Sequence, residues 1–256
     1  MKRILTFILT LTLALSFCVN SFAAATTATA SETQTGTSEA QTDTSKTQAG
    51  TSEAQTDTSK VQAGASYGIS NLSGAPDIVA ESAVVMDANT GTILYGKEAD
   101  TKRYPASITK VMTALLAVEN CKMSDVITYS NAAVNGIEAG SSTAGINVGA
   151  KLTVEDSLYA LMLVSANEAA AAIAEHISGS TTEFAKLMTK RAKELGCTNT
   201  QFKNPHGLPN EEHYTTAHDM GLILKEAMKH EEFRKISGTI SYTLKKSDTL
   251  KDTLER

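Results

Sequence analysis

A nearly exact tandem repeat without large apolar side chains limits which part of this chain can fold. Residues 33–46 read TQTGTSEAQTDTSK, residues 47–60 read TQAGTSEAQTDTSK, and a partial third copy begins at Val61. Val61 is the only large aliphatic residue between position 26 and Tyr67, so this stretch cannot bury enough surface to offset the entropy lost on ordering. A binding repeat is the alternative, but the unit has no apolar face on which to stack. We therefore predict a solvated linker over residues 26–75 and a folded domain over residues 76–256.

The N-terminus has the pattern of a secretory signal peptide over residues 1–25. Lys2 and Arg3 precede an apolar run over residues 4–19, and small residues follow for cleavage. Cys18 raises the alternative of lipid attachment, but Phe17 stands where that processing requires a small residue. We expect an exported protein, secreted or held in the cell envelope. No other segment is apolar for long enough to cross a bilayer, so no transmembrane segment is expected in the mature chain.

Charge and cysteine content exclude some classes of partner and site. The formal net charge is −5 and no basic cluster occurs, which argues against a nucleic-acid partner. After the predicted cleavage only Cys121 and Cys197 remain. Export permits a disulfide between them, but each lies beside a helix-like segment with core spacing, so two buried thiols are favoured.

Three histidines lie close together in the sequence, at positions 206, 213 and 218. Their spacing does not fit H-E-x-x-H or a cysteine and histidine zinc module. We therefore expect structural or surface roles for His206, His213 and His218, and we predict neither a metal site nor a cofactor.

The folded part combines a hairpin with a series of helices. Short apolar runs at residues 82–87 and 92–95 flank the turn residues 88–91, a pattern typical of a β-hairpin. Thr153 is placed to cap one helix and Gly196 to end another. Helices are predicted over residues 107–118, 167–177, 181–195 and 216–228, and a further helix opens at the Thr153 cap and runs to about residue 163. This order predicts an α+β domain in which a helical lobe lies beside an antiparallel sheet.

Two short motifs carry candidate chemistry. Ser107 and Lys110 form an S-x-x-K pair, and because residues i and i+3 share a helix face, Lys110 can take the proton of the Ser107 hydroxyl. Ser165 and Asn167 form an S-x-N pair at the break between two predicted helices, where side chains can project into a cleft. The same residues have alternative roles without chemistry. The serines and Asn167 could cap helices, and Lys110 could be an ordinary surface lysine.

With their surroundings, these motifs resemble the D-alanyl-D-alanine carboxypeptidases, low-molecular-mass penicillin-binding proteins of the serine peptidase kind. The resemblance implies a penicillin-binding/β-lactamase-like transpeptidase fold. It also implies a peptidoglycan stem peptide ending in D-Ala-D-Ala as substrate, trimmed of its terminal D-alanine, and β-lactam antibiotics as covalent inhibitors. The linker would then be a spacer through the cell wall. The similarity spans about residues 80–250 and is carried by residues 86–91, 104–113, 163–170, 204–208 and 214–220.

The resemblance assigns a role to each motif residue. Ser107 is the acyl-enzyme nucleophile and Lys110 the base for acylation. Ser165 relays a proton between Lys110 and the leaving amine, and Asn167 hydrogen-bonds the substrate backbone and Lys110. At a helix N-terminus, the Ser107 N–H and the helix dipole can stabilise a developing oxyanion. Lys110 must be neutral to act as a base, which requires burial or a nearby positive charge.

The sequence departs from the family in one motif. No Lys-Thr-Gly tripeptide occurs, although the resemblance implies one on the strand that holds the substrate carboxylate and supplies a second oxyanion N–H. We therefore expect residues 76–256 to be a C-terminally incomplete catalytic domain, poor or inactive as a carboxypeptidase. A non-catalytic peptidoglycan-binding or penicillin-binding homologue is the alternative. A class A β-lactamase is less favoured, because residues 165–167 read S-A-N rather than S-D-N and no deacylating glutamate is recognisable.

Overall fold

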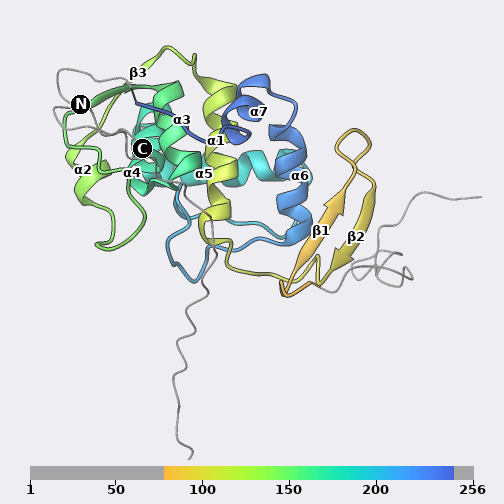
Figure 1. Cartoon of the computed structure of the whole chain (residues 1–256). Helices are drawn as coiled ribbons and strands as arrows, with labels where there is room; N and C mark the ends of the chain where they lie inside the picture. The colour runs from red at the N-terminus through yellow and green to blue at the C-terminus, as the bar shows by residue number, and fades with distance from the viewer. Residues whose placement is uncertain (1–77, 245–256) are drawn as a thin grey trace, which may run out of the picture. The chain divides into compact units, whose positions relative to one another are not determined.

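The computed structural model describes residues 78–244 (Figure 1). The predicted signal peptide and linker lie outside the described residues. Among the described helices, none is long and apolar enough to cross a membrane. In chain order the elements are β1 (Ala83–Met86), β2 (Ile93–Lys97), the 3₁₀ helix η1 (Ala106–Thr109), α1 (Lys110–Asn120), β3 (Val126–Thr128), α2 (Asn131–Asn135), β4 (Lys151–Thr153), α3 (Val154–Leu163), α4 (Asn167–Ser178), α5 (Thr181–Glu194), α6 (Ala217–Ala227) and α7 (Glu231–Ser237).

The predicted hairpin is confirmed. Strands β1 and β2 pair antiparallel, with a bulge between Val85 and Met86. Their turn is fixed by the Asp87 carboxylate, which accepts hydrogen bonds from the backbone N–H groups of Asn89 (3.0 Å) and Thr90 (2.7 Å). The hairpin packs against α6 through β1 (Figure 1). A small antiparallel sheet therefore lies beside the helices, as the α+β prediction requires.

Helix α4 lies at the centre of the helical lobe, in contact with α1, α2, α3 and α5. Residues 167–174 of this helix are all buried. Its run of alanines leaves little side-chain volume between the axes, so neighbouring helices can approach closely. The larger side chains around it complete the core, which includes Met112, Leu115, Leu116, Leu158, Leu161, Ile173, Phe184, Met188 and Ile223.

The predicted helix after the capping residue Thr153 is confirmed. Residues 151–153, for which no strand was predicted, form strand β4, which pairs antiparallel with β3. Helix α3 starts after Thr153, whose side chain accepts a hydrogen bond from the Asp156 N–H at 3.0 Å. The capping residue was thus correct, and the residues before it are extended because a cap lies outside the helix. Elements β3, α2 and α7 were not predicted.

Cys121 and Cys197 are free thiols, as predicted. Cys197 is buried, and burial raises the pKa of its thiol to about 12. Cys121 is only half-buried, so the expectation of two buried thiols holds fully for one of them.

Candidate active site

The first motif lies where η1 passes into α1. Ser107 belongs to the 3₁₀ helix, and the α-helix begins at Lys110, three residues later than predicted. The residues at the cap positions of these helices are Pro105 and Thr109, and neither makes a side-chain capping bond. Ser107 is therefore not a capping residue, and its hydroxyl is available for other contacts.

Two side chains of the predicted set contact the Ser107 hydroxyl. Lys110 Nζ donates to Ser107 Oγ at 3.3 Å, and Ser165 Oγ donates to it at 3.0 Å. Lys110 Nζ also donates to the carbonyl oxygen of His206 at 2.9 Å. A serine hydroxyl thus lies between an amine and a second hydroxyl, the arrangement that a serine nucleophile with a lysine base requires.

Asn167 is the first residue of α4 and is buried. Its backbone N–H donates to the Ser142 carbonyl oxygen at 3.0 Å, which ties the start of α4 to the preceding loop. The resemblance implies a hydrogen bond between Asn167 and Lys110, but the described part of the chain has none between these two residues.

Lys110 is buried, with 3 % of its surface exposed. Burial lowers the pKa of its ammonium to about 8, and the negative charge of Glu168 acts in the opposite direction. The alternative of a surface lysine is excluded. Ile108, an apolar neighbour in sequence, is itself 59 % exposed, so the burial comes from segments packed on α1 rather than from this side chain.

Unusual backbone conformations occur on both sides of the nucleophile. Ala106 and Ser165 have φ values of 46° and 57°, in the left-handed region that non-glycine residues rarely adopt. Ser165 lies between α3 and α4, and the cap position of α4 is Ala166, which makes no side-chain capping bond. The left-handed turn instead directs the Ser165 hydroxyl at Ser107. Such conformations carry energetic strain and concentrate at functional sites.

The segment 204–207, which reads Asn-Pro-His-Gly, packs over the nucleophile turn. Asn204 Oδ1 accepts from the Gly207 N–H at 2.7 Å, and the Thr113 hydroxyl donates to the Pro205 carbonyl oxygen at 2.6 Å. Gly207 has φ 87°, and any Cβ on it would collide with the carbonyl oxygen of Ala106. The segment therefore fixes both the nucleophile turn and the carbonyl that holds Lys110. These residues were identified from the sequence only through the family resemblance. An Asn-Pro-x-Gly string also predicts a turn in its own right.

The Peptidase S11 family model, described as D-alanyl-D-alanine carboxypeptidase, matches residues 70–255. The chain belongs to this family.

The chain matches only part of the length of its relatives in this family. D-alanyl-D-alanine carboxypeptidase DacF of Bacillus subtilis is 44 % identical over 165 residues, which are 62 % of this chain and 42 % of that protein. The chain therefore spans about two fifths of the length of this relative.

Solved structures of the family share the fold. The D-alanyl-D-alanine carboxypeptidase DacD of Francisella tularensis has a TM-score of 0.59 at 38 % identity, covering 63 % of this chain and 40 % of that one. The Streptomyces K15 DD-transpeptidase has a TM-score of 0.63 at 36 % identity, covering 66 % and 68 %. The predicted penicillin-binding transpeptidase fold is confirmed by these likenesses.

A groove among the described residues lies beside the nucleophile turn. It has a volume of about 710 Å³ and is lined by residues that include Tyr104, Pro105, Ile108 and Tyr214. Ser107, Lys110 and Ser165 are not part of its lining. The candidate site of this family member therefore rests on the hydrogen-bonded side chains rather than on the size of a cavity.

The histidines of the chain do not form a common site. The His206 carbonyl oxygen accepts from Lys110, and His213 is buried beside Thr109. His218 Nδ1 lies 3.2 Å from Asp100 Oδ1. Each ring thus has a separate set of contacts.

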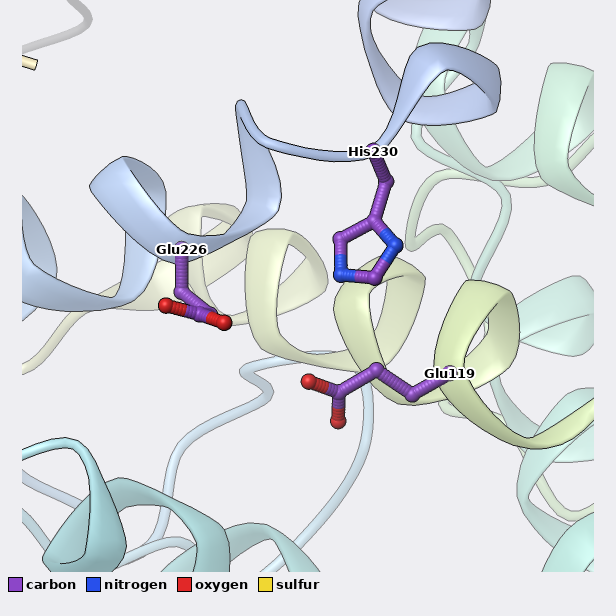
Figure 2. Close-up of side chains that lie close together, drawn as sticks. All are labelled: Glu119, Glu226 and His230. Atoms are coloured by element: carbon purple, nitrogen blue, oxygen red, sulfur yellow. The ribbon is translucent and has the colours of Figure 1, made fainter. Parts of the chain in front are cut away.

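A different group of residues brings metal-binding atoms together. Glu119, Glu226 and His230 each offer one atom within 4.8 Å of the others (Figure 2). They come from α1, the end of α6 and the residue before α7.

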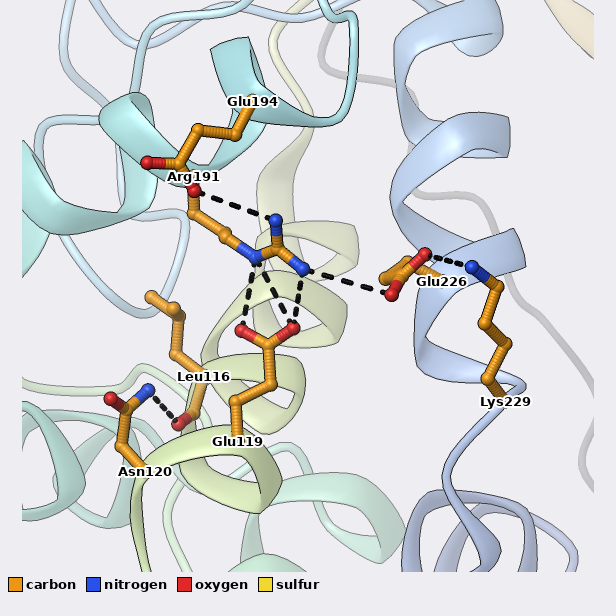
Figure 3. Close-up of polar contacts among 7 residues, drawn as sticks. All are labelled: Leu116, Glu119, Asn120, Arg191, Glu194, Glu226 and Lys229. Carbon is orange, nitrogen blue, oxygen red and sulfur yellow. Dashed lines mark hydrogen bonds and ion pairs between the residues drawn. The ribbon is translucent and has the colours of Figure 1, made fainter.

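An arginine already neutralises this group. Arg191 Nη2 lies 2.7 Å from Glu119 Oε1 and 3.7 Å from Glu226 Oε1, and its Nε donates to Glu119 as well (Figure 3). Lys229 Nζ contacts Glu226 at 2.6 Å. A metal ion would meet the guanidinium charge at close range, so the cluster fits an ion-pair network joining α1, α5 and α6 rather than a metal centre.

Proposed function

We propose that this protein is a serine-type D-Ala-D-Ala carboxypeptidase that removes the terminal D-alanine from peptidoglycan stem peptides. The observation that carries the proposal is the Ser107 hydroxyl, held between Lys110 Nζ and Ser165 Oγ. Family membership supplies the substrate class, because the family description names D-alanyl-D-alanine carboxypeptidase. β-Lactam antibiotics are the covalent inhibitors that this substrate class implies.

The reaction begins with Lys110. In its neutral form, Lys110 takes the proton from Ser107 Oγ as that oxygen attacks the carbonyl carbon of the penultimate D-alanine. Burial supports this step, because it lowers the pKa of Lys110 to about 8 and leaves a usable neutral fraction near neutral pH. The Ser107 backbone N–H, at the start of a helical segment, is one donor to the oxyanion of the tetrahedral intermediate.

Breakdown of the intermediate releases D-alanine. The lysine proton passes through the Ser165 hydroxyl to the leaving nitrogen, and the C–N bond breaks to leave an ester on Ser107. The 3.0 Å contact between the two serine hydroxyls supports this relay. Water then hydrolyses the ester. Asn167 hydrogen-bonds the substrate backbone in this scheme.

The site is proposed to act outside the cytoplasm. Residues 1–25 would direct export, and residues 26–75 would serve as a spacer between the domain and the N-terminus of the mature chain. Relatives named as carboxypeptidases of this family support a role in the cell wall.

Covalent labelling tests the proposal. A labelled penicillin incubated with the purified protein should attach to the peptide containing Ser107, and any release of D-alanine from a diacyl-Lys-D-Ala-D-Ala peptide should depend on the same serine. Ser107→Ala should abolish both signals. Ser124→Ala is the matched control, because Ser124 is an exposed loop serine. Label that persists in Ser107→Ala would overturn the assignment.

A binding protein without turnover is the second candidate. Labelling of Ser107 without release of D-alanine would support this candidate over the carboxypeptidase.

A further inference from the structure

A buried carboxylate lies directly beside the second motif. Glu168 follows Asn167 in the first turn of α4 and is 2 % exposed. Acidic side chains are almost never fully buried unless they are paired, because removal of the charge from water is unfavourable. The position of Glu168 therefore requires an explanation, which the reaction proposed above does not supply.

One oxygen of this carboxylate holds the neighbouring loop. Glu168 Oε1 accepts from the Thr143 hydroxyl at 2.7 Å, from the Ala144 N–H at 2.7 Å and from the Ile146 N–H at 3.4 Å. The Asn167 N–H reaches the same loop one residue earlier, at Ser142. The first turn of α4 thus fixes segment 142–146, and the segment fixes the turn.

The other oxygen has no such partner. Glu168 Oε2 is buried and accepts no hydrogen bond from the described residues. A hydrogen bond missing from a buried oxygen costs about 1–3 kcal/mol, and more for a charged group. The helix dipole at the N-terminus of α4 offsets part of this cost, since it favours negative charge in the first turn.

The ionisable groups around this carboxylate come from other segments. Lys110 of α1 interacts with it electrostatically, and so does Tyr129, which follows β3. Tyr129 stays neutral, because burial raises the pKa of its phenol above the ordinary value. His206 interacts with Lys110 from segment 204–207 and is also neutral at pH 7, because burial and the Lys110 charge lower its pKa to about 4. Asp156 of α3 is a second buried carboxylate and acts on Tyr129, so Lys110 is the cation that Glu168 faces.

We propose that Glu168 is a positioning residue for the Ser107 and Lys110 centre. Its Oε1 holds segment 142–146 against the turn that carries Asn167, and its charge attracts the Lys110 ammonium and favours the protonated amine. The inference rests on the proposed function only in taking Lys110 as the base. Burial and Glu168 act on Lys110 in opposite directions, and their balance sets how much neutral amine exists near neutral pH.

A titration of Lys110 tests the charge without any need for turnover. The protein is labelled with ¹³Cε-lysine, and the Lys110 resonance is assigned by its loss in Lys110→Arg. Glu168→Gln keeps the side-chain shape and removes the charge, so the midpoint of the Lys110 titration should fall by at least about half a pH unit. Thr143→Val is the matched control. It removes one hydrogen bond to Oε1 and leaves the charge, so the midpoint should stay at the wild-type value.

Hydrogen exchange tests the contact with the loop. Glu168→Asp keeps the charge but shortens the side chain, so the Ala144 and Ile146 amides should exchange at least about tenfold faster than in the wild type. This variant also keeps the proposal testable if Glu168→Gln does not fold, because unchanged exchange in Glu168→Asp would overturn the role in holding the loop.

Two further outcomes decide the charge effect. If the midpoint of the Lys110 titration were unchanged in folded Glu168→Gln, the effect of the Glu168 charge on Lys110 would be overturned. A shift of the midpoint in Thr143→Val as large as the shift in Glu168→Gln would overturn it as well. The rate of penicillin acylation should follow the Lys110 midpoint, so Glu168→Gln should move the acidic limb of that profile to lower pH. A wild-type protein that titrates as expected but is never acylated would contradict the proposed function and leave the assignment of Glu168 standing.

Discussion

Thr109 Oγ1 and His213 Nε2 lie 2.9 Å apart in the core, although 104 residues separate them in the sequence. The other ring nitrogen, Nδ1, accepts from the Lys203 N–H at 3.2 Å. Since Nδ1 is an acceptor, the ring proton of neutral His213 is on Nε2 and is donated to Thr109. Thr109 precedes Lys110, so this contact fixes the junction of η1 and α1 that presents the nucleophile.

The His213 contact predicts a loss of stability in acid. Burial lowers the pKa of His213 to about 4, against an ordinary value of 6.5. As the pH falls from 6.5 to 4, the unfolded chain takes up a proton that the folded protein does not, so the free energy of unfolding decreases by up to about 3 kcal/mol. Urea unfolding at pH 7.5 and pH 4.5 measures this loss.

The control for that experiment is His213→Gln, which cannot titrate. Because His206 contributes a loss in the same range of pH, the informative quantity is the difference between the wild type and His213→Gln. The variant should lose less stability on acidification. Equal losses in the two proteins would show that His213 does not carry the effect.

Gly207→Ala should be severely destabilising. The new methyl group would collide with the Ala106 carbonyl oxygen, and the φ of 87° is itself unfavourable for alanine. We expect a loss of more than about 3 kcal/mol in the free energy of unfolding, with loss of penicillin acylation.

Gly140→Ala separates the two causes. Gly140 has a similar φ of 82° but nothing within 4 Å of the added Cβ. Gly140→Ala should therefore lower the free energy of unfolding only through the unfavourable positive φ, by about 1 kcal/mol. If the two variants were equally destabilised, the close approach of Gly207 to the nucleophile turn would be irrelevant to stability.

The rate of acylation should depend on the protonation state of Lys110. Because the pKa of Lys110 is lowered to about 8, the neutral amine becomes scarcer below that pH, and the rate should fall about tenfold for each unit. Lys110→Arg should not be acylated at any pH from 6 to 9.5, because a guanidinium stays protonated throughout. Stopped-flow measurement with a chromogenic β-lactam gives the profile, and a flat profile would exclude Lys110 as the base.

The elements with a strong local signal were predictable from the sequence. The two short apolar runs that flank residues 88–91 predicted the hairpin, and the alanine run after Asn167 predicted the buried helix α4. The S-x-x-K and S-x-N spacings named Ser107, Lys110 and Ser165, which the structure brings together. These features depend on residues close in sequence, where spacing and capping chemistry decide the conformation.

The contacts that hold the site were not predictable in the same way. The His206 carbonyl that accepts from Lys110 is 96 residues away in sequence, and any residue type could supply a carbonyl oxygen. Glu168 was noted only within residues 163–170 of the resemblance, and only the packing of segment 142–146 shows that it is buried. Strands β3 and β4 have three residues each, too few for a periodic pattern to be recognised.

The network around Arg191 should contribute measurably to stability. Its guanidinium makes short contacts with Glu119 and a longer one with Glu226, and the three side chains are 25 %, 17 % and 22 % exposed. Arg191→Met would leave the Glu119 carboxylate without its cationic partner and Glu226 with Lys229 alone. We expect a loss of about 1–3 kcal/mol in the free energy of unfolding, measured in urea.

A double-mutant cycle isolates the ion pair from the packing of the arginine stem. Arg191→Met should be less destabilising in a Glu119→Gln background, because one of the unpaired charges is then absent. Lys186→Met is the control: its ion pair with Glu183 is 68 % and 56 % exposed, so the change should stay within about 0.5 kcal/mol. Added Zn²⁺ should not raise the unfolding midpoint of the wild type, since the guanidinium competes for the carboxylates. Additive effects of the two substitutions, or stabilisation by zinc, would mean that Arg191 does not neutralise this cluster.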